Sequence, residues 1–398
     1  MRMQEAYIVA YGRSAVAKGK ASGALFYSRP DDIAAQVLKG TIDRIEGNFD
    51  PDTIDDVIVG CSTPEGPQGT NIARTIALRA GLSQKVPGQT VNRFCSSGLQ
   101  TIATAANSII AGQNDIVAAG GVEFMSSLPM GGNEPTNNPT LQDGGPKTGV
   151  PMGITAENVA DKYNISREDQ DAFAVESHRR AAAAQDANLF DEIIPVQVQK
   201  PKYTANGVEM TTETFDTDEL VRRGTTMETL AKLPTAFRRN GTVTPGQSSP
   251  ITDGAGFVVL MSGDKVKELG VKPIAKFVGY KVAGVAPEIM GIGPVEAVPA
   301  VMKQTGLTLE DMDLIEFNEA FAAQIVASMR ELNMNPEVTN VNGGAIALGH
   351  PLGATGAIVT AKLLSEMKRR KESKYGLVTM CIGGGMGAAG IFEYVGER

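Results

Sequence analysis

The stretch VNRFCSSGLQTIATAANSII, residues 91–110, joins two patterns of different period at a cysteine. Its start continues a strand-like run, and its later apolar residues recur at helical spacing, at Leu99, Ile102, Ala106 and Ile109. Cys95 therefore falls where a predicted strand ends and a predicted helix begins. The free N–H groups and the dipole of a helix start favour an anion, which would make the thiol a better source of thiolate. From this stretch alone, a small buried hydrophobe is an equally good interpretation.

A second junction of this kind lies in NGGAIALGHPLGATGA, residues 342–357. Its glycines permit tight turns, and Pro351 suits the first position of the helix predicted by the apolar residues that follow. His350 directly precedes Pro351 and is a candidate general base, because imidazole titrates close to neutral pH. The chain has 2 histidines. We interpret the other, His178 in VESHRRAAAA, as a structural residue on a half-buried helix face.

Cys381 lies in LVTMCIGGGMGAAGIF, residues 377–392, where an apolar strand breaks into glycines. Backbone N–H groups left free in such a turn can bind an oxyanion. A dinucleotide-binding loop is the rival interpretation of the run from Gly383 to Gly385. We reject it because no helix with a later acidic residue follows these glycines.

Asn318 opens the sequence NEAFA after the apolar run 314–317. At the end of a strand, its side-chain amide can hold a water molecule or an oxyanion. Taken alone, Asn318 could equally be a helix cap. Cys61 follows another apolar run, 57–59, and we interpret it as a buried structural thiol.

The first 120 residues alternate strand-like and helix-like segments, which is typical of an α/β fold. Strands are predicted at 7–10, 57–59, 89–92 and 116–118, with helices at 33–45, 72–78 and 96–112. The alternation stops at residues 126–153, where glycine, proline and asparagine dominate. We interpret the segment from there to about residue 249 as an inserted loop domain, in which Ser166 and Asp169 form the capping box of a helix.

The second half of the chain repeats the first in outline. Residues 56–59 resemble residues 313–316, and each run precedes a segment that carries a candidate catalytic residue. If the halves are duplicates, their equivalent helix starts face one site, and Cys95 meets His350. The predicted division is 1–120 plus 250–270 as the N-terminal catalytic half, 121–249 as the loop domain, and 271–398 as the C-terminal catalytic half.

Composition sets limits on function. The chain of 398 residues is long enough for two or three structural units, and its net charge of -8 argues against a nucleic-acid-binding surface. The 3 cysteines are widely spaced and show neither a disulfide framework nor a zinc-ligand pattern. No apolar run approaches the roughly 20 residues that cross a bilayer, and the start lacks a signal-peptide core, so we predict a cytoplasmic protein without membrane insertion.

The stretches around Cys95, Asn318, His350 and Cys381 resemble the four signature motifs of the thiolase family, in the family's order. Three further segments are similar to thiolase loop-domain and CoA-binding segments, at 152–160, 222–237 and 242–255. The resemblance spans essentially the whole chain. It implies the thiolase fold, an α/β fold of duplicated βαβ halves in α-β-α-β-α layers with an inserted loop domain.

The resemblance also implies roles for individual residues. Cys95 would attack the ketone of a 3-ketoacyl-CoA, and His350 would take its proton. His350 and a water held by Asn318 would bind the thioester oxygen, and Cys381 would shuttle the substrate proton. The N–H groups of Cys95 and Gly383 would form a second oxyanion hole. The CoA-binding positions would be Arg222, Thr229, Phe237 and Ser249, with Met152, Ala320 and Phe321 lining the pantetheine path.

The resemblance implies no metal and no permanently bound cofactor, since coenzyme A and acyl-CoA are substrates. It predicts a homodimer or homotetramer, with association with other fatty-acid oxidation enzymes as a further expectation. Pro151 stands where short-chain biosynthetic members carry a histidine, so we expect longer acyl chains and a degradative, β-oxidation type of thiolase. A biosynthetic acetoacetyl-CoA thiolase and a non-catalytic acyl-CoA or lipid-binding protein on the same fold are the alternatives.

Overall fold

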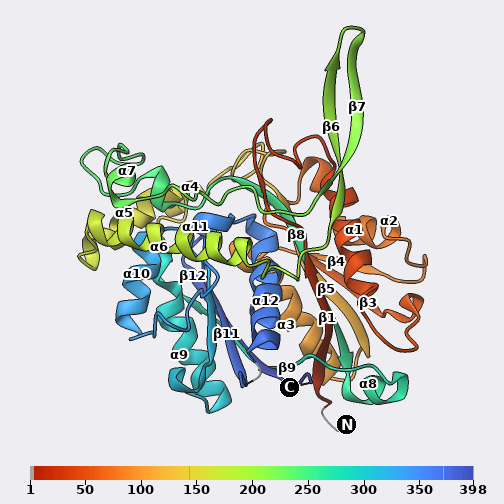
Figure 1. Ribbon diagram of the computed structural model, residues 1–398. Helices are drawn as coiled ribbons and strands as arrows, with labels where there is room; N and C mark the ends of the chain where they lie inside the picture. Colours follow the sequence, from red (N-terminus) through yellow and green to blue (C-terminus); the bar gives the residue numbers. More distant parts are fainter. Residues whose placement is uncertain (1–3, 143, 371, 398) are drawn as a thin grey trace.

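The computed structural model describes residues 4–142, 144–370 and 372–397, and a large mixed sheet is its framework (Figure 1). Within these ranges ten strands pair in the order β10-β11-β12-β9-β1-β8-β5-β3-β4, with β2 beside β8. The strands are β1 (Ala6–Arg13), β2 (Ala17–Lys18), β3 (Asp56–Gly60), β4 (Gly88–Val91), β5 (Ile116–Phe124), β8 (Thr252–Ser262), β9 (Ala275–Gly284), β10 (Leu314–Phe317), β11 (Tyr375–Ile382) and β12 (Met386–Tyr394). All residues of β5 and β8 are buried, as expected for central strands that are covered on both faces.

The sheet consists of two copies of one topology. In the N-terminal half the order is β4-β3-β5-β8-β1, and in the C-terminal half it is β10-β11-β12-β9. A parallel bridge between Ile315 and Thr339 occupies the position that β4 has in the first half. The halves join where two residues of β1 pair with two of β9. The predicted duplication is therefore confirmed.

The register of the duplication differs by one residue from the sequence prediction. Asp55, not Asp56, is the structural equivalent of Asp313. Asp55 donates its N–H to Ile116 O (2.8 Å) and accepts from Ile116 N (2.9 Å), and Asp313 makes the same two contacts with Tyr375 (both 3.0 Å). The apolar run after each aspartate fits either register, so sequence alone could not decide between them.

Helices cover the sheet in layers, as the sequence predicted (Figure 1). Three hydrophobic clusters fill the spaces between these layers. One lies between the first half-sheet and helices α1 and α2, one surrounds α3 and α12 in the middle, and one lies between the second half-sheet and helices α9 and α10. The helices of the two halves are α1 (Pro30–Ile42), α2 (Ile72–Arg79), α3 (Ser97–Ile110), α8 (Gly263–Leu269), α9 (Gly293–Thr305), α10 (Ala322–Glu331), α11 (Ala345–Leu348) and α12 (Leu352–Arg369). The two central helices, α3 and α12, start next to the predicted catalytic residues.

A long insertion separates β5 from β8. Its elements are α4 (Pro139–Gln142), α5 (Met152–Lys162), α6 (Arg167–Asp186), β6 (Val196–Thr204), β7 (Gly207–Phe215) and α7 (Met227–Ala231). The predicted capping box of α6 is present: Ser166 Oγ accepts from Asp169 N (3.0 Å), and Asp169 Oδ2 accepts from Ser166 N (3.1 Å). Within its described residues, 126–142 and 144–153, the segment expected to be irregular is so except for the short α4 and the first residues of α5.

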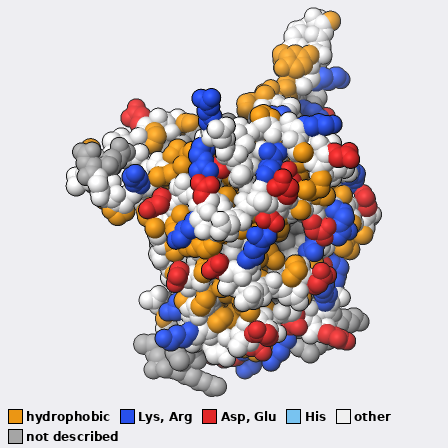
Figure 2. All heavy atoms as spheres, turned by 90° about the vertical axis from the view of Figure 1, so that its left-hand side faces the viewer, with side chains coloured by type: hydrophobic (Ala, Val, Ile, Leu, Met, Phe, Trp, Pro, Cys, Tyr) orange, Lys and Arg blue, Asp and Glu red, His pale blue; other side chains and the backbone are white. Residues whose placement is uncertain are grey.

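Strands β6 and β7 form an arm that stands away from the body (Figure 1). Its base is held because Val196, Val198 and Phe215 belong to the core of the N-terminal half. Figure 2 shows the arm rising above the molecule with hydrophobic side chains toward its outer end, where Tyr203 is 76% exposed. The arm therefore lies outside the packed layers that position the site.

Candidate active site

Cys95 lies in a tight turn between β4 and α3. The turn is a single 3-10 segment, Phe94–Ser96, and Phe94 has a φ of +44°, which is uncommon for a residue with a side chain. Hydrogen bonds fix it: Asn92 Oδ1 accepts from Phe94 N (2.8 Å), and the Ser97 hydroxyl donates to Phe94 O (2.7 Å). The sulfur-bearing residue is 8% exposed. The predicted position of Cys95 at a helix start is confirmed.

The surroundings of the sulfur raise its pKa, contrary to our expectation from the helix start. Burial raises the pKa of Cys95 to about 11, although the backbone N–H groups of Gly383 and of Cys95 itself act in the opposite direction. At neutral pH the thiol therefore keeps its proton. A nearby base must remove this proton before the sulfur can attack.

In the turn that follows Cys381, the backbone requires a glycine at position 385 but not at position 383. Gly385 has a φ of +87°, and a Cβ on it would lie 2.3 Å from the carbonyl oxygen of Val285. A Cβ on Gly383, by contrast, would meet no atom closer than 3.9 Å, at Met152 and Phe94. The protein itself therefore leaves room for a side chain at Gly383. A side chain there would narrow the space between Met152 and Phe94.

His350 is positioned to act as a neutral base. It is 3% exposed, and burial lowers its pKa to about 4. Its Nδ1 lies 2.6 Å from Thr355 Oγ1, and its Nε2 lies 3.3 Å from Asn318 Nδ2. An uncharged imidazole can accept a proton at physiological pH.

Close crossing of the two central helices brings their starts together. The 3-10 turn of Cys95 packs against α12, the helix that begins just after His350. A Cβ on Gly356 would lie 2.1 Å from Leu99 N, and one on Gly98 would lie 2.7 Å from Ala357 N. Only glycine allows these backbones to approach so closely.

The other two predicted catalytic side chains end strands of the second half-sheet. Cys381 is fully buried in β11, and its pKa is raised by burial and by the nearby Cys95. Asn318 follows β10, and its Oδ1 has no hydrogen-bond partner among the residues that the structure describes. The structure thus places Cys95 with Gly383 and Cys381, and Asn318 with His350.

Most of the predicted CoA-binding residues gather beside Cys381. Ala320 and Phe321 share a hydrophobic cluster with this cysteine, and Met152 packs against the cluster. The Phe237 ring meets the Phe321 ring edge-to-face, with 6.0 Å between centroids. Ser249 joins the group through its N–H, which donates to Ala320 O (3.0 Å). The apolar residues predicted along the pantetheine path therefore lie together.

Arg222 and Thr229 lie outside this cluster, on the segment that leads through α7. The Arg222 side chain is exposed and has no ion-pair partner in the described ranges, whereas Arg223 is paired with Asp186 (2.7 Å). Thr229 is used locally, because its hydroxyl accepts from Thr226 N (2.9 Å) in a capping box. Of the two, only Arg222 offers an uncompensated charge to an anionic ligand.

Sequence reasoning missed the groups that hold these residues in place. Buried Glu123 accepts hydrogen bonds from Ser62 N (2.6 Å) in one half and from Gly353 N (2.8 Å) at the start of α12 in the other. The sequence feature that could have revealed Glu123 is that it is the only acidic residue in the otherwise uncharged strand β5. His178 was interpreted as a structural residue. Its Nδ1 accepts a hydrogen bond from Arg222 N (3.1 Å), so it holds the segment that carries the unpaired Arg222 side chain.

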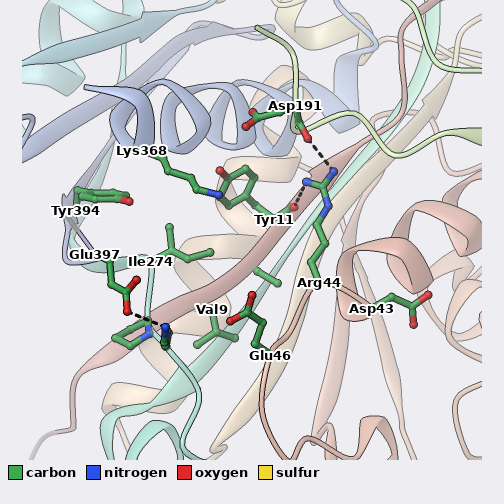
Figure 3. Close-up of a pocket in the computed structure, with 14 residues that line it drawn as sticks. Val9, Tyr11, Asp43, Arg44, Glu46, Asp191, Ile274, Lys368, Tyr394 and Glu397 are labelled. Atoms are coloured by element: carbon green, nitrogen blue, oxygen red, sulfur yellow. Dashed lines mark hydrogen bonds and ion pairs between the residues drawn. The ribbon is translucent and has the colours of Figure 1, made fainter. Parts of the chain in front are cut away.

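A cavity of about 610 Å³ opens beside β1 (Figure 3). It is lined by β1, the segment after α1 and the C-terminal residues, including Tyr11, Arg44 and Lys368. None of the predicted catalytic or CoA-binding residues borders it. We therefore place the site by its chemistry rather than by cavity volume.

A buried thiol, a neutral imidazole and two backbone N–H groups directed at the sulfur define an enzyme that transfers acyl groups through a cysteine thioester. Comparison with known families agrees with this class. The model of the thiolase N-terminal domain matches residues 6–264, and that of the thiolase C-terminal domain matches residues 271–394. The chain belongs to the thiolase family.

Individual relatives match over their full length. The 3-ketoacyl-CoA thiolase of Bacillus subtilis (strain 168) is 52% identical over 396 residues, which cover 98% of this chain and 100% of the relative. The crystal structure of Bacillus anthracis acetyl-CoA acetyltransferase superposes with a TM-score of 0.88 at 39% identity, covering 99% of this chain and 100% of that one. Human mitochondrial 3-ketoacyl-CoA thiolase in complex with CoA gives 0.87 at 38% identity, covering 98% of both chains. The predicted thiolase fold is confirmed.

In the described ranges, no helix is long and apolar enough to cross a membrane. The same ranges contain no group of three or more His, Cys, Asp and Glu side chains placed to hold a metal ion.

Proposed function

We propose that this chain catalyses the CoA-dependent thiolysis of 3-ketoacyl-CoA to acetyl-CoA and a shortened acyl-CoA, through an acyl-Cys95 intermediate. The reverse reaction is a Claisen condensation. The observation that carries the proposal is that a protonated, buried Cys95 and a neutral, buried His350 stand at the starts of two helices, α3 and α12, that pack against each other. Such a pair makes a thiolate only when the proton moves from sulfur to imidazole.

In the first half-reaction, the Cys95 thiol gives its proton to His350 and the sulfur attacks the 3-keto carbon. The bond between C2 and C3 breaks, which leaves the enolate of acetyl-CoA and an acyl group on Cys95. The protonated ring of His350, with a water held by Asn318, stabilises the enolate oxygen. Cys381 then donates its proton to C2. Its raised pKa suits this role, because the thiol carries a proton at neutral pH.

In the second half-reaction, the thiol of a second CoA gives its proton to the Cys381 thiolate, and its sulfur attacks the acyl-Cys95 thioester. The tetrahedral oxyanion is stabilised by the N–H groups of Cys95 and Gly383, and removal of one such donor typically costs about 3–4 kcal/mol. The direction of these groups toward the sulfur supports this assignment. Collapse of the intermediate breaks the bond to Cys95 and releases the shortened acyl-CoA, and the Cys95 sulfur takes its proton back from His350.

In this proposal CoA is held by segment 121–249, which includes Ser249, and by the Ala320–Phe321 pair. Met152, Ala320 and Phe321 offer an apolar path to Cys381. Arg222, which has no ion-pair partner in the described ranges, meets a phosphate group of CoA. The free space beside Gly383 is where the pantetheine arm passes, so this residue is a glycine because of the ligand.

The substrate in this proposal has an acyl chain longer than four carbons. Relatives named 3-ketoacyl-CoA thiolase and relatives named acetyl-CoA acetyltransferase both match the full chain. Pro151, which precedes α5 at the position of the short-chain histidine, and the 52% identity to the Bacillus subtilis 3-ketoacyl-CoA thiolase favour the degradative type. Cytoplasmic location, a homodimer or homotetramer, and association with other fatty-acid oxidation enzymes stay predictions from the sequence.

The test is a thiolysis assay with 3-ketoacyl-CoA of four carbons and upward, with free CoA in excess. We expect acetyl-CoA to form with a rate that peaks above four carbons. A sharp optimum at four carbons would favour the biosynthetic acetoacetyl-CoA thiolase. No acetyl-CoA from folded, CoA-binding protein would favour the non-catalytic binding protein.

A further inference from the structure

We infer that Thr355 is a positioning residue that holds His350 in the one tautomer able to take the Cys95 proton. This inference rests on the proposed function of His350 as the base. Thr355 lies in the first turn of α12 and is 1% exposed. Its hydroxyl lies 2.6 Å from His350 Nδ1, so it touches the ring on the side away from Asn318.

The hydrogen bonds of Thr355 decide which ring nitrogen carries the proton. A hydroxyl has a single proton, and that of Thr355 is donated to Pro351 O at 2.9 Å. Its oxygen can then only accept from His350, which places the ring proton on Nδ1. Nε2 is left with a free electron pair.

The contact on the Nε2 side of the ring favours the same tautomer. Nε2 lies 3.3 Å from the Asn318 side-chain nitrogen, which can only donate. Because burial keeps His350 uncharged, its tautomer alone determines which nitrogen can receive the proton from sulfur. In this arrangement the Cys95 proton moves to Nε2, and the resulting Nε2–H becomes a donor to the substrate oxygen.

Close packing does not fix these contacts by itself. Thr355 and Asn318 both border a small buried cavity of about 20 Å³, which is room for about one water molecule. A water molecule could replace a hydroxyl that is removed together with its methyl group. Thr355→Val is therefore the sharpest variant, because it keeps the shape of the side chain and removes only the hydroxyl, and Thr355→Ser is the matched control that retains it.

The experiment measures kcat and KM for thiolysis against pH, and the rate at which iodoacetamide alkylates Cys95. In Thr355→Val we expect kcat to fall on the order of a hundredfold, since a general base contributes about 10²–10⁴-fold. KM should be unchanged, and alkylation near pH 7 should slow about tenfold, with its rise displaced to higher pH. Thr355→Ser should restore both rates to within about threefold, because the tautomer then returns.

A wild-type kcat and alkylation profile in Thr355→Val would overturn the inference, and so would an equal loss in Thr355→Ser. If the Val variant does not fold, Thr355→Ser must still match the wild type, and Thr355→Ala, in which a water molecule replaces the hydroxyl only in part, must be alkylated more slowly than Thr355→Ser. Alkylation also separates the two proposals. Wild-type protein without thiolysis would refute the proposed function, whereas a Thr355-dependent alkylation rate would still support the positioning of His350.

Discussion

The two halves of the molecule make the same chain reversal in very different ways. In the C-terminal half, β11 and β12 are joined by three glycines, residues 383–385. In the N-terminal half, the equivalent strands β5 and β8 are joined by residues 125–251, with α5, α6, α7 and the β6–β7 arm between them. Both connections begin at the same end of their half-sheets, where Cys95 and His350 lie.

The two connections differ in the function that we propose for each. The short connection places a backbone N–H against the Cys95 sulfur, which needs a rigid turn. The long connection provides Met152, Phe237 and the free Arg222, which recognition of a large ligand needs. The proposed catalytic groups therefore come from the duplicated parts, and most of the proposed ligand contacts come from the part that is not duplicated.

The largest effect is expected at Cys95, the one side chain of the N-terminal half that we propose to be catalytic. Cys95→Ala should lower thiolysis on the order of 10⁴-fold or more, because no acyl-enzyme can form. Acetyl-CoA release and mass spectrometry of the acylated protein measure this. Cys61→Ala is the control, since Cys61 is fully buried beside Glu123 and should leave kcat within a few-fold. Equal losses in both variants would contradict the assignment.

In the short connection, we expect one glycine to matter for stability and another to matter for activity. Gly385→Ala should destabilise the protein by about 3–4 kcal/mol, because a positive φ is combined with a clash against Val285 O. Gly383→Ala should leave the unfolding free energy unchanged within about 0.5 kcal/mol and yet lower kcat/KM, because its Cβ meets substrate space. Denaturant unfolding and thiolysis assays measure the two. A stable Gly385→Ala variant would show that the turn is not rigid.

The long connection should lose stability in acid through His178. Burial lowers the pKa of His178 from 6.5 to about 4, so the folded state binds its proton later than the unfolded state does. Its contribution is present above pH 6.5 and is lost as pH falls toward 4. His178→Asn keeps an acceptor for Arg222 N, and it should reduce the acid-induced loss by about 2–3 kcal/mol. His350 acts in the same direction, so some slope should remain; an unchanged pH profile of unfolding would exclude this account.

The smallest effect is expected at the surface of the long connection. Arg222→Ala should raise KM for CoA about fivefold, near 1 kcal/mol, because an exposed cation contributes modestly. Arg223→Ala is the matched control, since Arg223 is paired with Asp186 and should leave KM unchanged. The Arg222 effect should shrink as salt is added. If both substitutions raised KM for CoA equally, the attraction of CoA would come from the overall positive charge of this surface and not from Arg222 in particular.

The sequence predicted positions better than it predicted energies. The turn of Cys95 and the glycines after Cys381 were visible because the periodicity changes there. The pKa of Cys95 was expected to fall and instead rises, because burial depends on α12 and β11, which are distant in sequence. Glu123 and Thr355 escaped prediction for the same reason, since their partners are known only after the chain has folded.

The two donors that face the Cys95 sulfur belong to the peptide backbone. A substitution that changes only a side chain cannot delete them, and among the common residues only proline lacks the N–H. The two N–H donors themselves should therefore survive random mutation more often than the His350 and Asn318 side chains do, even where a new side chain lowers activity. A descendant of this gene that has lost its histidine base could still hold an oxyanion beside residue 95, which is a ready starting point for a different acyl-transfer reaction.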